Sequence, residues 1–334
     1  MLQKLLPILV VIATLIFSGC SSKQYYKPET SISLSGSSMQ DTLIHYSRDG
    51  ATLASGNVLT KTEKVNLSLP KGFYFINHSK KAALTADLKG NCHIITNKGI
   101  LASTKFPQAL VAGTLVGKYL IYVLQNNHYG VYDFSQQKII FDHKSNKAFA
   151  IDTRIANPLQ IDKLVVIPTL DGKLTILDLS TLKIAKEMYI STESVLNNII
   201  FLNKINNSLI AATPTKVVSV SGKGKKELEA GISEVAMSTK NLFVFTKDGR
   251  ILKMDEGLTI QAEKKFKFAH FSVAYVDAEK VYALDKQGYL IVSNHSLSKN
   301  RVYKLSEVEG YAFISNSQLY FDDEIVDLSK LSYE

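Results

Sequence analysis

Short apolar runs rich in β-branched and aromatic residues alternate with polar turns along most of the chain. The clearest unit covers residues 164–183, where two apolar runs, 164–167 and 174–177, flank Asp171-Gly172. An Asp-Gly pair in this setting predicts a β-hairpin with a type I′ turn, in which both central residues have positive φ. No sustained helical periodicity follows the apolar N-terminal stretch, and the pattern therefore predicts an all-β fold.

This hairpin unit recurs about every 40 residues, with room for two further short strands between hairpins. Four-stranded units repeated at this period indicate a β-propeller, because each sheet must bury both faces against its neighbours. Eight hairpins favour eight blades over seven, and a pair of β-sandwiches is the structural alternative. The predicted turns are Asp49-Gly50, Lys89-Gly90, Tyr129-Gly130, Asp171-Gly172, Thr215-Lys216, Asp248-Gly249, Gln287-Gly288 and Asp322-Asp323.

The end of the chain leaves the last predicted blade incomplete. The final hairpin, residues 319–328, is followed by too few residues for a full outer strand. The apolar stretch near residues 32–34 is the best candidate to supply this strand. We therefore expect a strand from near the N-terminus to close the ring.

Residues 1–19 have the pattern of an export signal. Lys4 provides a positive charge, and the apolar stretch 5–17 is shorter than a membrane-spanning helix requires. The stretch ends in Phe17-Ser18-Gly19-Cys20, which resembles the lipobox of bacterial lipoproteins, with Phe17 where leucine is usual. The resemblance implies cleavage before Cys20 and acylation of that residue, palmitate included. An ordinary signal peptide is the alternative.

The resemblance also implies where the protein is located. Ser21, rather than aspartate, follows the cysteine, as in lipoproteins sorted to the outer membrane. We therefore expect a lipid-anchored protein on the outer membrane, facing the periplasm. The expected organisation is a signal peptide at 1–19, a lipidated cysteine with a flexible tether at 20–40, and a propeller at 41–334.

Charge adds two candidate surfaces. The formal net charge is +9, and the basic residues cluster only at Lys223-Gly224-Lys225-Lys226 and Lys264-Lys265-Phe266-Lys267. Each cluster is either a solvated strand edge or a patch for an acidic partner or anionic lipid. An exported chain is a poor candidate for binding nucleic acid.

Few residues point to chemistry at a site. Cys92, the only cysteine besides Cys20, is expected to be a small strand residue, and the fold is expected to need no disulfide. The histidines lack zinc-site spacing, and the acidic run Asp322-Asp323-Glu324 lies at a predicted turn. We therefore expect no catalytic, cofactor-binding or metal-binding residue and no cofactor.

Two segments carry a family resemblance. Residues 131–138 and 176–183 are similar to the quinoprotein-type propeller repeat x-Asp-x-x-Thr-Gly-Lys, with Gln137 and Leu182 at the glycine position. A lipidated periplasmic propeller of this length resembles the BamB family of the outer-membrane β-barrel assembly machinery. That resemblance implies a non-catalytic scaffold that contacts the barrel-inserting subunit.

An enzyme or a ligand-binding protein that uses the central funnel is the alternative. A quinone cofactor site would need a stacking aromatic and a Ca²⁺ ligand set, and the chain has no tryptophan and no Ca²⁺-loop motif. A glycosidase is a further alternative, because catalytic carboxylates contributed by different blades would show no characteristic spacing in the sequence.

Overall fold

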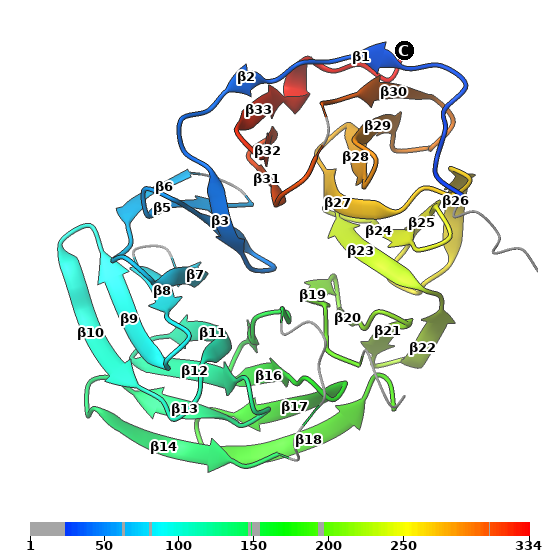
Figure 1. Ribbon diagram of the computed structural model, residues 1–334. Coiled ribbons are helices and arrows are strands. Elements are labelled where there is room, and N and C mark those ends of the chain that lie inside the picture. The colour runs from blue at the N-terminus through cyan, green and yellow to red at the C-terminus, as the bar shows by residue number, and fades with distance from the viewer. Residues whose placement is uncertain are drawn as a thin grey trace, which may run out of the picture.

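The computed structural model describes residues 24–61, 64–79, 82–145, 148, 154–192, 197–306 and 308–334. These residues form eight sheets, antiparallel except for one added N-terminal strand, arranged in a ring around a central axis (Figure 1). The prediction of an all-β propeller with eight four-stranded blades is therefore confirmed. The described part of the chain contains one short 3₁₀ helix, η1 (Leu328–Lys330), and no helix that is long and apolar enough to span a membrane.

Blades 1 to 4 each consist of four consecutive strands. Blade 1 contains β3 (Leu43–Tyr46), β4 (Gly50–Leu53), β5 (Asn57–Thr60) and β6 (Lys64–Ser68); blade 2 contains β7 (Tyr74–Ser79), β8 (Ala82–Ala86), β9 (Asn91–Thr96) and β10 (Gly99–Lys105); blade 3 contains β11 (Leu110–Val116), β12 (Tyr119–Leu124), β13 (Tyr129–Asp133) and β14 (Lys138–His143); blade 4 contains β15 (Leu159–Ile161), β16 (Leu164–Pro168), β17 (Lys173–Asp178) and β18 (Lys183–Tyr189).

Blades 5 to 7 follow the same order, and blade 8 has three strands from the C-terminal end. Blade 5 contains β19 (Phe201–Ile205), β20 (Ser208–Ala212), β21 (Lys216–Ser221) and β22 (Gly224–Glu229); blade 6 contains β23 (Ile232–Met237), β24 (Leu242–Thr246), β25 (Arg250–Met254) and β26 (Ile260–Lys265); blade 7 contains β27 (Phe271–Val276), β28 (Lys280–Asp285), β29 (Tyr289–Asn294) and β30 (Asn300–Lys304); blade 8 contains β31 (Ala312–Ser315), β32 (Gln318–Phe321) and β33 (Glu324–Asp327).

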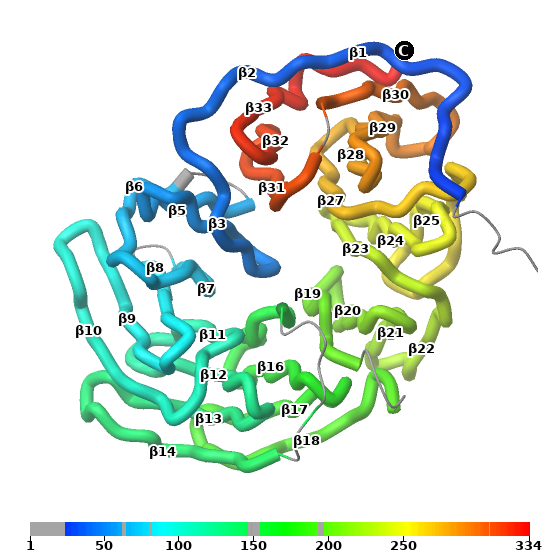
Figure 2. Tube along the Cα trace, viewed as in Figure 1, coloured from blue at the N-terminus to red at the C-terminus, as the bar shows by residue number. Residues whose placement is uncertain are grey.

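The ring is closed by two short strands near the N-terminus. β1 (Ile32–Ser33) pairs in parallel with β30, and β2 (Ser37–Ser38) pairs antiparallel with β33 as the fourth strand of blade 8. Figure 2 shows this N-terminal segment running along the outside of the last two blades. The closing strand therefore lies a few residues after the predicted position near 32–34, and residues 32–33 instead extend blade 7.

The core is divided among the contacts between blades. Eight clusters of buried apolar side chains can be distinguished, and each is formed by two neighbouring blades. Phe243 and Phe245 of blade 6, for example, pack with Val281 and Ile291 of blade 7. A single sheet cannot bury both faces by itself, so stacking around the ring accounts for the packing of every blade.

The Asp171-Gly172 hairpin differs in detail from its prediction. Thr169 and Lys173 pair across a three-residue loop, and only Gly172, at φ 81°, has positive φ. This is the arrangement of a three-residue loop with a left-handed third position, rather than a type I′ turn. The Thr169 hydroxyl accepts a hydrogen bond from the Lys173 amide at 2.9 Å, which fixes the loop.

Two predicted turns lie elsewhere. Asp49-Gly50 connects the first two strands of blade 1, and Tyr129-Gly130 lies inside β13. The turn before β13 uses Asn127, at φ 68°, in place of glycine. Gly130 is required for a different reason, because a Cβ there would lie 2.3 Å from the Phe141 carbonyl oxygen.

The repeat motif at 131–138 and 176–183 forms the same turn in blades 3 and 4. Gln137 and Leu182, at the glycine position, have φ of 53° and 54°. Asp133 Oδ1 accepts hydrogen bonds from the Ser135 amide and hydroxyl, and Asp178 Oδ1 accepts the equivalent pair from Ser180. The turn conformation is thus kept although glycine is absent.

Candidate functional site

The inner strands of the blades surround an axial cavity of about 840 Å³. Strands β7, β11, β15, β19, β23 and β27 contribute to its wall, and the β3–β4 turn reaches in from blade 1 (Figure 1). This turn carries Arg48 and Asp49, two charged residues that face the axis. The central funnel is the place where an enzymatic propeller would have its site, so we describe its charges first.

Arg48 links distant blades across the axis. Its Nη1 lies 3.4 Å from Glu234 Oε2 of blade 6, and its Nε donates to the Arg154 carbonyl oxygen at 3.2 Å. Both side chains of the Arg48–Glu234 pair are largely buried, at 16% and 23% exposure. The pair therefore connects the β3–β4 turn to the opposite side of the ring.

Asn157, just before blade 4, links three further elements. Its Nδ2 donates to Asp49 Oδ2 at 2.6 Å and to the Ile76 carbonyl oxygen at 3.2 Å. Its Oδ1 accepts from the Gly113 amide at 2.9 Å. One amide side chain thus joins blades 1, 2 and 3 at the axis.

His45 lies close to this network. Its ring stacks on Tyr74 at 4.5 Å, and the guanidinium of Arg154 lies over the neighbouring Tyr46 ring at 4.3 Å. Burial, together with the positive charge of Arg154, lowers the pKa of His45 to about 4. At neutral pH this imidazole is therefore uncharged in the folded protein.

The two axial carboxylates described above, Asp49 and Glu234, both have nitrogen partners from other blades. Asp49 also has Lys61 Nζ at 3.9 Å. Among the described residues, no group of three or more histidine, cysteine, aspartate or glutamate side chains could hold a metal ion. These contacts of Asp49 and Glu234 link blades across the axis.

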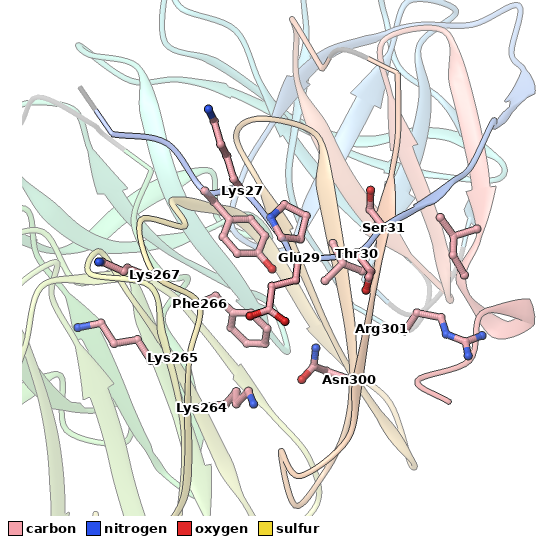
Figure 3. A pocket seen from close by; sticks show the side chains of 14 residues that line it. Lys27, Glu29, Thr30, Ser31, Lys264, Lys265, Phe266, Lys267, Asn300 and Arg301 are labelled. Atoms are coloured by element: carbon pink, nitrogen blue, oxygen red, sulfur yellow. The ribbon is translucent and has the colours of Figure 1, made fainter. Parts of the chain in front are cut away.

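A second hollow, of about 640 Å³, lies on the outer rim between blades 6 and 7 (Figure 3). The N-terminal segment forms one wall, and the end of β26 and the start of β30 form the others. Five cationic side chains and one carboxylate line it. They are Lys27, Lys264, Lys265, Lys267, Arg301 and Glu29.

Tyr26 fixes the N-terminal segment at this rim. Its ring makes edge-to-face contacts with Phe266 and Tyr289, with centroids 6.1 and 5.6 Å apart. Burial, and secondarily the charge of Asp285, raises the pKa of Tyr26 to about 12. From Tyr26 onward, the stretch expected to be a flexible tether is therefore docked on the ring.

The structure describes only some of the candidate residues that the sequence indicated. Phe17, Ser18, Gly19 and Cys20 lie outside the described residues. Cys92 is buried in the core between blades 2 and 3, and burial raises the pKa of its thiol to about 12.

The acidic run at the β32–β33 turn accepts hydrogen bonds from three main-chain amides and one hydroxyl group. Glu324 accepts hydrogen bonds from the Gly36 amide and the Ser306 hydroxyl, both at 2.7 Å. Asp322 accepts the amides of Glu309 and Gly310. The run therefore helps to fasten the closing segment to blade 8.

Sequence reasoning missed the axial residues Arg48, Asn157 and Glu234. Arg48 and Glu234 are 186 positions apart and belong to no common motif. Tyr26 was likewise read as part of a tether. Only the spatial arrangement of the blades brings these residues to their partners.

Comparison with known proteins reveals similarity in sequence. No family model matches the chain. The chain is 27% identical to the plasminogen-binding protein PgbB of Helicobacter pylori, over 93% of this chain and 67% of that protein.

The fold is similar to solved propellers. BamB from Moraxella catarrhalis superposes with a TM-score of 0.65 at 13% identity, covering 87% of this chain and 98% of that one. The C-terminal WD40 domain of Sif2 gives 0.61 at 10% identity, covering 90% and 97%. In fold, the chain is a BamB-like eight-bladed β-propeller.

Proposed function

We propose that this protein is a non-catalytic, lipid-anchored scaffold that binds other proteins of the cell envelope. The observation that carries the proposal is that the axial polar side chains are engaged between blades. Arg48 pairs with Glu234 and donates to the Arg154 carbonyl oxygen, and Asn157 donates to Asp49 and accepts from the Gly113 amide. These groups connect blades, which supports a role in holding the ring together rather than in catalysis.

The comparisons support a binding role. The sequence relative is named for binding plasminogen, and BamB shares the fold. On this basis we propose that partners are envelope proteins, with the barrel-assembly machinery as the specific candidate. Anchoring at Cys20 on the periplasmic side of the outer membrane is part of the same proposal.

Crosslinking in the intact envelope, followed by pull-down of this protein, tests the binding role. We expect defined protein partners, barrel-assembly components among them. Recovery of the protein alone would contradict the proposal. In the same cells, Cys20→Ala should move the protein out of the outer-membrane fraction, and retention there would contradict the anchor.

A further inference from the structure

The outer rim between blades 6 and 7 carries an excess of positive charge. Lys264 and Lys265 end β26, and Lys267 follows in the turn to blade 7. Lys265 has a carboxylate neighbour, Asp248, at 3.7 Å, but that carboxylate is shared with Arg250 at 2.9 Å. Within the described ranges no ion pair involves Lys264 or Lys267.

The other lysine cluster likewise has one lysine paired with a shared carboxylate. In blade 5, Lys225 Nζ lies 2.5 Å from Glu227 Oε1, and Lys216 lies 3.0 Å from the same carboxylate. The two clusters have similar sequence character and similar ion pairing, but only the rim cluster lines a hollow together with the N-terminal segment. Lys223, Lys225 and Lys226 therefore provide a matched comparison for the rim lysines.

An exposed aromatic side chain accompanies the rim lysines. Phe268 is 37% exposed, and Lys267 Nζ lies 4.9 Å from the centre of its ring. Aromatic rings beside lysines are typical of surfaces that rest at the lipid headgroup level, where the ring enters the interface and the ammonium groups meet phosphates.

The proposed anchor, Cys20, is close in sequence to a residue that lines this surface. Tyr26 is fixed between Phe266 and Tyr289, and Cys20 is six positions earlier in the chain. A chain of six residues spans at most about 20 Å when extended. An acyl group on Cys20 would therefore hold the rim within about 20 Å of the bilayer.

We propose that this basic rim, formed by Lys27, Lys264, Lys265, Lys267 and Phe268, docks on an anionic phospholipid surface. The proposal rests on the proposed anchor at Cys20, which brings the rim to a bilayer. Acyl chains combined with basic residues bind membranes more firmly than either signal alone. Because the surface is on the circumference, docking would leave both faces of the ring available to partners.

The absence of tryptophan from the chain provides a specific probe. Phe268→Trp places a single indole in the rim, and Tyr189→Trp places one on β18 of blade 4, at a side chain 50% exposed. Each full-length variant is purified from the envelope and reconstituted with vesicles of phosphatidylcholine, with or without phosphatidylglycerol. Indole emission is then recorded at low and high salt.

We expect a blue shift for F268W with phosphatidylglycerol, its loss at high salt, and no shift for Y189W. Adding Lys264→Glu, Lys265→Glu and Lys267→Glu to F268W should abolish the shift. Adding Lys223→Glu, Lys225→Glu and Lys226→Glu instead should preserve it.

Equal F268W emission with both vesicle types would overturn the docking proposal, as would loss of the shift in both triple variants. A shift that needs an added acidic envelope protein would also overturn it in favour of a protein partner. Flotation of the protein with neutral vesicles tests the anchor separately. Failure of the protein to float with them would contradict the anchor at Cys20, whereas docking is tested by the indole emission with anionic vesicles.

Discussion

At the residue scale, the most informative side chain is one whose neighbours change its protonation state. His45 is held neutral at the axis by burial and by Arg154. The positive guanidinium of Arg154 is in turn placed over Tyr46. These contacts involve side chains from segments more than 100 residues apart, so composition and local motif could not predict them.

The His45 pKa leads to a prediction about pH. In the unfolded chain the pKa is near 6.5, whereas in the folded protein it is about 4, so the unfolded state binds more protons between these values. The stabilising contribution is complete above pH 6.5 and decreases as the pH falls toward 4, by up to about 3 kcal/mol. Chemical denaturation of wild type and His45→Phe at pH 7 and pH 4.5 measures this.

The variant should lose less stability on acidification than the wild type does, because phenylalanine cannot be protonated and still stacks on Tyr74. An equal loss in both proteins would show that His45 does not contribute to the acid sensitivity.

At the scale of the element, the turns between strands determine how clearly the repeat can be detected in the sequence. The β13–β14 turn keeps a left-handed residue at Gln137, an exposed position where an L side chain costs about 1 kcal/mol. The Asp133 carboxylate offsets this cost by accepting hydrogen bonds within the turn. Burial opposes the charge of Asp133, but hydrogen bonds from Ser135 and Lys118 lower its pKa to about 2.

Gln137→Gly should therefore raise the free energy of unfolding by about 0.5–1 kcal/mol, since glycine adopts this conformation without strain. Gln136→Gly is the matched control. Gln136 is also exposed but is not among the residues with positive φ, so its replacement should destabilise by a similar amount. Urea denaturation of both variants measures the difference, and a destabilised Q137G would contradict the account.

Turn prediction succeeded in most blades, also at two turns without glycine, Thr215-Lys216 before β21 and Asp322-Asp323 before β33, and it failed in blade 3. Gly172, Gly249 and Gly288 all have positive φ between the second and third strands of their blades. Asn127 takes that role in blade 3, while Gly130 serves close packing. The two-residue strands β1 and β2 are too short to produce a pattern, which explains the displaced closing strand.

At the scale of the whole molecule, the sequence period was sufficient to predict the ring and the number of blades. The site was not predictable in the same way. The axial network and the basic rim each combine side chains from several blades, and their neighbours in space are set only when the ring closes. Of the rim, only the lysine run at 264–267 was visible in the sequence.

The proposed function is that this propeller binds partners through its surfaces and performs no chemistry in its channel. Asp49→Asn combined with Glu234→Gln tests it most directly, because the amides keep shape and hydrogen-bonding capacity while removing both acid–base groups. The measurement is complementation of a deletion strain, scored as sensitivity to large antibiotics that the outer membrane excludes. The account predicts full restoration, and failure to restore at wild-type protein level would contradict it.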